Sequence, residues 1–144
     1  MANSSTISLL TETSKGVEMA IFSFNQLLER IHDPAMKKIV SESNNDHLRL
    51  KAEVDNLLKA NEIEIEEPGF LAKTMSWMDS SMKLAMEDSD RVIADIITKG
   101  CEMGSRTLRK YINEYAESDL TAAETAKKLI KIEENLEEKL RLYL

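Results

Sequence analysis

The sequence contains few of the residues that interrupt helices. Only four glycines and two prolines occur among its 144 residues, and aromatic residues make up 5%. Because glycine and proline are the strongest helix breakers, the abundant Glu, Lys, Leu, Met and Ala residues predict long helices. The length and a hydrophobic content of 42% indicate one globular domain over residues 1–144 with a single core.

Further absences narrow the range of functions. A lone cysteine, Cys101, excludes an internal disulfide and suits a reducing cytoplasm. No apolar run approaches the roughly 20 residues that span a bilayer, and the first residues lack the basic and apolar regions of a signal peptide. A net charge of −7 argues against binding a phosphate backbone. We therefore expect a cytoplasmic protein that binds neither a membrane nor nucleic acid.

Apolar residues at helical spacing predict four long helices, over residues 6–32, 34–61, 90–117 and from about 119 to the C-terminus. Asp33 and Pro34 lie between the first two helices, where Asp suits an N-cap and Pro suits the first helical turn. These two helices should therefore form a tight antiparallel hairpin. Ser118 and Asp119, followed by Thr121 and Glu124, resemble a capping box that opens the last helix.

The stretch between the second and third long helices distinguishes two kinds of bundle. An extended part ends at Pro68 and Gly69, and an amphipathic segment over 70–86 then carries Trp77 and several methionines. A helix of this length would cover about 25 Å, enough to run along the bundle. Simple up-down bundles use short loops throughout, whereas ferritin-like bundles have one long crossover. The prediction is an all-α, ferritin-like up-down four-helix bundle with an extra short helix in the crossover between helices 2 and 3.

The second helix has a histidine in the middle of its apolar stripe. His47 follows the spacing of a set of residues that fall on one face of a helix: Met36, Val40, Ser43, Leu50, Val54 and Leu57. Ferritin-like di-metal bundles carry a Glu-x-x-His pair at such a place. Here Asn44 stands three residues before His47, so the histidine is present and the glutamate is absent.

Three carboxylates accompany His47 as candidates for the interior. Glu133 lies in the stripe of the last helix, Glu137 lies close beside it, and Glu18 lies at the edge of the apolar face of the first helix. The third helix is expected to turn Glu102 outward. Its predicted inner face comprises Ile93, Ile97, Gly100, Gly104, Leu108, Tyr111 and Tyr115. The two glycines on that face would permit close backbone approach or leave room for a bulky neighbour.

These inward groups have two interpretations, because a buried carboxylate needs an ion partner, a hydrogen bond or a metal ion. In one, the four residues Glu18, His47, Glu133 and Glu137 bind metal, with iron as the cofactor, since hard cations prefer carboxylate together with imidazole. In the other, they form a polar layer in which His47 is hydrogen-bonded to a glutamate and no cofactor is held. In either case we expect His47 to be buried and hydrogen-bonded to a side chain or a backbone carbonyl.

Short motifs along most of the chain resemble a bacterial ferritin-like family catalogued as a domain of unknown function. Lys15-Gly16-Val17-Glu18-Met19-Ala20 is a loose counterpart of that family's Asp-Gly-x-x-Gly-Tyr, Asp33-Pro34 matches its hinge, Trp77 lies in the crossover segment, and Cys101-Glu102-Met103-Gly104-Ser105-Arg106 is similar to Cys-Glu-Arg-Gly-Glu-Asp. The resemblance implies the ferritin-like fold. It does not imply an intact di-iron centre, because Lys15, Ser105 and Arg106 stand at acidic positions of the family.

Three functions follow as hypotheses. The first is a non-catalytic ferritin-like protein with a degenerate di-metal site, which acts as a homodimer or small oligomer or through a protein partner. The alternative is a metal-binding bundle or oxidoreductase that uses the four candidate ligands. A third is a bundle that binds a small molecule beneath its crossover. The missing ligands favour the first hypothesis, so we expect no enzymatic activity and no stoichiometric iron.

Overall fold

The computed structural model describes residues 3–63 and 89–144, and every regular element within these ranges is helical. The long helices are α1 (Ser4–Leu27), α2 (Pro34–Ala60), α4 (Asp90–Glu114) and α5 (Leu120–Leu140), and short 3₁₀ turns, Leu28–Arg30 and Arg141–Tyr143, follow α1 and α5. The prediction of an all-helical chain with four long helices is confirmed. The expected crossover helix over 70–86, with Trp77, lies outside the described residues.

Capping side chains explain where two of the helices begin. Asp33 accepts a hydrogen bond from Met36 N at 2.9 Å and so caps α2, as predicted. The start of α5 agrees with the prediction in position, because Asp119 accepts from Ala122 N at 2.8 Å and is the N-cap. Thr121 already lies within the helix, so the part of the predicted capping box that used Thr121 is wrong.

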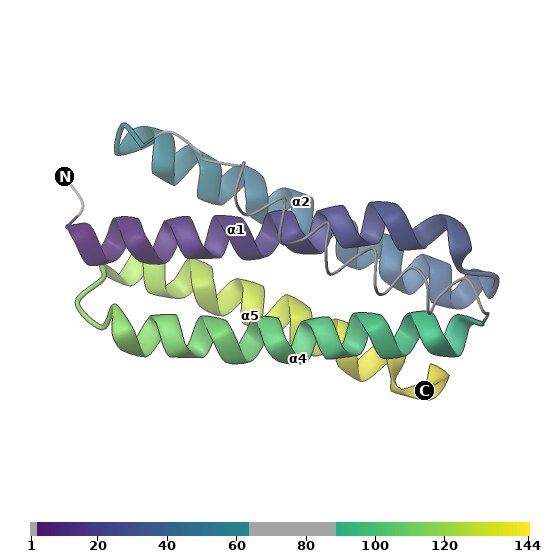
Figure 1. Cartoon of the computed structure of the whole chain (residues 1–144). Helices are drawn as coiled ribbons and strands as arrows, with labels where there is room; N and C mark the ends of the chain where they lie inside the picture. The colour runs from purple at the N-terminus through teal and green to yellow at the C-terminus, as the bar shows by residue number, and fades with distance from the viewer. Residues whose placement is uncertain (1–2, 64–88) are drawn as a thin grey trace.

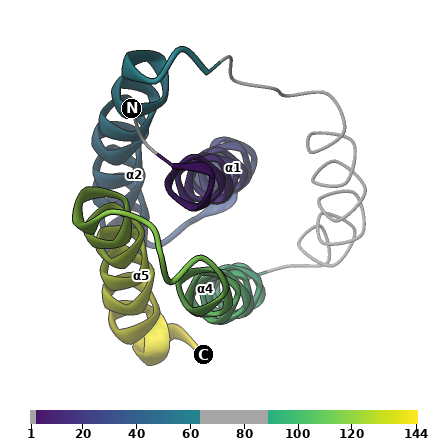
Figure 2. The same cartoon turned by 90° about the vertical axis from the view of Figure 1, so that its left-hand side faces the viewer.

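The end of α2 and the start of α4 are separated by the length of the bundle because of the directions in which the helices run. In Figure 1, α1 and α5 run one way, and α2 and α4 run the other way. The end of α2 and the start of α4 therefore lie at opposite ends of the bundle. The end-on view of Figure 2 places α2 beside α5 and α1 beside α4, so each of these neighbouring pairs is antiparallel.

The apolar interior is divided into two clusters. One cluster, near the α1–α2 turn, contains Phe24, Leu27, Ile31, Met36, Val40, Ile93, Ala94, Ile96, Ile97, Cys101, Leu136 and Leu140. The other contains Leu9, Leu10, Val17, Leu50, Val54, Leu58, Leu108, Ala122, Ala126, Leu129 and Ile130. The buried residues that lie between the clusters along α2, α4 and α5 are polar: Ser43, His47, Ser105 and Glu133. We call these four residues the polar layer.

The buried stripe of α2 agrees closely with the sequence. All of its predicted members are buried except Leu57, which is half-buried, while its neighbour Leu58 is 1% exposed. The buried face of α4 differs more. Cys101 and Ser105 are buried there, while Gly100 and Gly104, each one residue earlier, are half-buried, so α4 is rotated relative to the prediction.

Hydrogen bonds at one end of the bundle connect its two helical hairpins. The carboxylate of Asp90, the first residue of α4, accepts from His32 N and from Asp33 N, both at 2.8 Å. The hydroxyl of Tyr143, just after α5, donates to Asp33 Oδ2 at 3.1 Å. The start of α2 is thus fixed to the start of α4 and to the end of α5.

We predict that Asp90→Ala lowers the free energy of unfolding by about 1–2 kcal/mol, because two backbone amides lose a charged acceptor. Asp95→Ala is the matched control, since Asp95 lies on the same helix and its contact is an exposed ion pair with Lys99. Urea denaturation followed by circular dichroism measures both. Equal losses in the two variants would show that the Asp90 bonds contribute nothing specific.

Candidate functional site

His47 lies at the centre of the bundle, and one of its ring nitrogens is hydrogen-bonded. It is 0% exposed, and its Nδ1 lies 2.7 Å from the carbonyl oxygen of Ser43. The ring also meets Phe24 of α1 edge to face, with centroids 5.0 Å apart. The prediction of a buried His47 with a hydrogen bond to a side chain or a backbone carbonyl is therefore confirmed. The acceptor is a backbone carbonyl, not the glutamate of the polar-layer interpretation.

The Ser43 carbonyl determines the tautomer of His47. A carbonyl can only accept, so Nδ1 carries the proton and donates it. Burial lowers the pKa of His47, which favours the neutral ring. The other nitrogen, Nε2, is buried and has no hydrogen-bond partner among the described residues. In the neutral ring, Nε2 therefore presents a lone pair to the interior.

Glu133 is the inward carboxylate that the sequence places most accurately. It is 5% exposed, and its Oε2 has no hydrogen-bond partner among the described residues. Burial raises the pKa of Glu133 to about 8, because an ionised carboxylate would be poorly solvated there. At neutral pH the side chain is therefore mostly an uncharged acid.

The carboxyl group of Glu133 packs against the backbone of α4 at Gly104. A Cβ atom added at Gly104 would come within 2.7 Å of each carboxyl oxygen. Any other residue would compete with Glu133 for this space, so the expectation that Gly104 leaves room for a bulky neighbour is confirmed. The same expectation fails at Gly100, where an added Cβ meets no described atom within 4 Å.

His47 and Glu133 lie at the same level of the antiparallel pair α2 and α5. Lys128 Nζ of α5 is 2.8 Å from Glu53 Oε1 of α2, which aligns the two helices. His47 lies about six residues before Glu53, and Glu133 lies about five residues after Lys128. Because the helices are antiparallel, the levels of His47 and Glu133 along the bundle differ by one helical rise, about 1.5 Å. His47 and Glu133, the two titratable residues of the polar layer, therefore face the same level of the bundle.

Glu18 does not belong to this layer. Its Oε1 lies 2.9 Å from Lys51 Nζ, and the same ammonium lies 2.7 Å from Asp55 Oδ2. Partial burial alone would lower the pKa of Lys51, but the bonds to Asp55 and Glu18 raise it. Ser14 Oγ also lies 3.4 Å from Asp55. Glu18 is thus part of a polar network at the α1–α2 interface, with a cation as its partner.

Glu137 and Glu102 meet at the outer seam between α5 and α4. Burial, followed by a hydrogen bond to Glu102, raises the pKa of Glu137. Glu102 is exposed as expected, yet it points along the seam toward α5 rather than away from it. The rotation of α4 described above accounts for this. Burial also raises the pKa of the nearby Cys101 thiol, which is therefore unreactive.

The described side chains do not fit a two-metal centre. Such a centre in this kind of bundle needs a Glu from each of two helices and a Glu-x-x-His from each of the other two. Here α4 presents Gly104 to the interior, Glu18 is paired with Lys51, and Asn44 stands before His47. Within residues 3–63 and 89–144, no three His, Cys, Asp or Glu side chains lie close enough together to hold a metal ion.

Comparison with models of known protein families gives no match for this chain, and comparison with curated proteins finds no significantly similar one. Across the described part of the chain, no helix combines the length and the apolar character that a membrane crossing requires. The interpretation of the site therefore depends on its own geometry.

Sequence reasoning missed the partners of the inward groups rather than the groups themselves. Lys51 was not identified as the partner of Glu18, although Lys51 and Asp55 are four residues apart on the same face of α2. That pair is a recognisable signal in the sequence. The Ser43 carbonyl gives no such signal, because a backbone acceptor has no residue preference.

We predict that Gly104→Ala and Gly100→Ala change stability in opposite directions. Alanine is the better helix former by about 1 kcal/mol, so Gly100→Ala should stabilise the protein by up to that amount. Gly104→Ala should destabilise it by about 1–2 kcal/mol, because the new Cβ displaces the Glu133 carboxyl group. Adding Glu133→Ala should remove the difference. A Gly104→Ala protein as stable as Gly100→Ala would contradict the close packing.

We predict that stability falls as pH rises because of Glu133. The ordinary pKa of its carboxyl is 4.5 and the folded value is about 8, so the folded state retains a proton that the unfolded chain loses. The resulting stabilisation is complete below pH 4.5 and declines by about 1.4 kcal/mol per pH unit up to pH 8. Glu133→Gln abolishes this decline.

Chemical denaturation of wild type and Glu133→Gln at several pH values between these limits tests the prediction. The difference in unfolding free energy should grow in favour of the variant by a few kcal/mol across the range. Glu138→Gln, at an exposed position of the same helix, should follow the wild type. A Glu133→Gln curve parallel to the wild-type curve would rule out a buried, protonated Glu133.

Proposed function

We propose that this chain is a ferritin-like bundle protein without a catalytic centre, which acts by binding a second copy of itself or another protein in the cytoplasm. The parallel directions of α2 and α4 support the ferritin-like part of the proposal, because consecutive helices that run in parallel require a long crossover. The motifs that resemble the bacterial family of unknown function point to the same fold.

One observation carries the non-catalytic part of the proposal. Glu133 packs its carboxyl group against α4 at Gly104, where a glutamate or aspartate could not be accommodated without displacing it. Among the described residues, Glu133 is the carboxyl group buried in the polar layer, and it is held largely as a neutral acid. Two metal ions would need several charged carboxylates.

A second candidate function, metal binding with or without oxidoreductase activity, has one observation in its favour. The Nε2 of His47 and the Oε2 of Glu133 are both buried, both free of hydrogen bonds from described residues, and at the same level. A metal ion at this point would have imidazole and carboxylate as ligands, the donor types that iron accepts. Glu18 and Glu137 would have to leave Lys51 and Glu102 to join them.

Metal analysis distinguishes the two functions. The purified protein is loaded with ferrous iron in air, desalted and analysed for its metal content, and the rate of iron oxidation is recorded. The proposal predicts far less than one iron per chain and no ferroxidase activity. About two irons per chain, absent from His47→Leu, would establish the metal-binding function instead. Sedimentation equilibrium of the same samples tests for self-association.

A further inference from the structure

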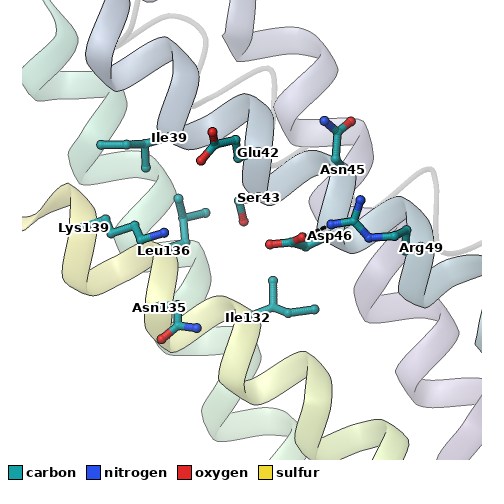
Figure 3. Close-up of a pocket in the computed structure, with 10 residues that line it drawn as sticks. All are labelled: Ile39, Glu42, Ser43, Asn45, Asp46, Arg49, Ile132, Asn135, Leu136 and Lys139. Carbon is teal, nitrogen blue, oxygen red and sulfur yellow. Dashed lines mark hydrogen bonds and ion pairs between the residues drawn. The ribbon is translucent and has the colours of Figure 1, made fainter.

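A groove of about 330 Å³ lies between α2 and α5, outside the polar layer. Figure 3 shows its lining, with α2 forming one wall and α5 the other. The base is apolar and comprises Ile39, Ile132 and Leu136. The volume lies near the lower limit for ligand pockets, so an occupant would be a small molecule.

The α5 wall carries two polar side chains that are free to bind a ligand. Lys139 and Asn135 line the groove four residues apart, and neither makes a hydrogen bond or ion pair with another described residue. Four residues is about one helical turn, so the two side chains project from the same side of α5. An ammonium and an amide N–H close together form a suitable site for a carboxylate.

The α2 wall carries an acidic group opposite them. Glu42 projects from this wall across from Lys139 (Figure 3), and its ion pair with Lys38 is long, at 4.0 Å, and exposed. The other acid, Asp46, is already paired with Arg49. Glu42 and Lys139 do not form an ion pair with each other, so opposite charges face each other across an apolar base without direct contact.

We propose that this groove binds a small zwitterion, an α-amino acid with an aliphatic side chain. Its carboxylate would lie on Lys139 and Asn135, its ammonium on Glu42, and its side chain against the apolar base of the groove. This arrangement gives Lys139 an anionic partner, gives Glu42 a second cationic partner besides Lys38, and covers apolar surface of the groove. The proposal goes beyond the protein-binding function and does not depend on it.

L-Leucine serves as the probe, with the ¹⁵N-labelled full chain observed by NMR. Leucine should shift the backbone amide signals of residues 39–49 and 132–139, with a dissociation constant in the millimolar range. Two analogues each lack one charge: 4-methylpentanoate has no ammonium and 3-methylbutylamine has no carboxylate. Each should bind at least about tenfold more weakly than leucine, which corresponds to the loss of one contact.

Two variants test which protein residue contacts each charged group of leucine. Lys139→Gln should weaken leucine about tenfold and leave the amine analogue unchanged, whereas Glu42→Gln should weaken leucine and leave the carboxylate analogue unchanged. Lys127→Gln, an exposed lysine on α5 outside the groove, is the control and should bind leucine normally. The amide spectra also report whether each variant is folded. Absence of shifts at the groove, or equal weakening by Lys127→Gln, would overturn the proposal.

Discussion

The contact between the Glu133 carboxyl group and the backbone of α4 is the constraint on which the centre of this bundle depends. Because Gly104 has no side chain, α4 approaches α5 closely enough to enclose the carboxyl group. Enclosure removes water, and the loss of water keeps the acid protonated at neutral pH. The close approach of α4 therefore also determines the protonation state of Glu133.

The polar layer separates the two apolar clusters, and this arrangement has an energetic cost. Uncharged polar groups without hydrogen bonds are destabilising by a few kcal/mol when buried, and leucines of similar volume would avoid that loss. The layer nevertheless restricts how the helices can slide along one another, because a shift of one turn would place His47 or Glu133 inside an apolar cluster. Polar residues in a core commonly set the register of helices in this way.

Most of the helical architecture could be predicted from the sequence, because it depends on local signals. Asp33 and Pro34 mark a hairpin by their own conformational preferences, and the stripe of α2 follows from the helical repeat alone. The face of α4 was less predictable. Its sequence offers Gly100 and Gly104 in one row and Cys101 and Ser105 in the next, and only packing against α5 decides between them.

The sequence predicts which residues of the candidate site are buried, but it does not predict which residues they pair with. Burial of His47 and Glu133 follows from their positions in apolar stripes, which each helix specifies separately. The partner of each group depends on two helices at once. Glu18 pairs with Lys51 on α2, and Glu137 pairs with Glu102 on α4. The residue pattern of one helix does not predict which residue of another helix lies next to it.

The hydrogen bonds at the two ends of the bundle have a consequence for how the chain assembles. Asp90 binds the amides of His32 and Asp33 at one end, and Thr6 accepts from Asp119 N at the other. Each of these bonds joins the α1–α2 hairpin to the α4–α5 hairpin, so the two hairpins are docked by contacts at both ends of the bundle. If two copies exchanged hairpins, the same contacts would form between chains, because they depend only on these helix ends.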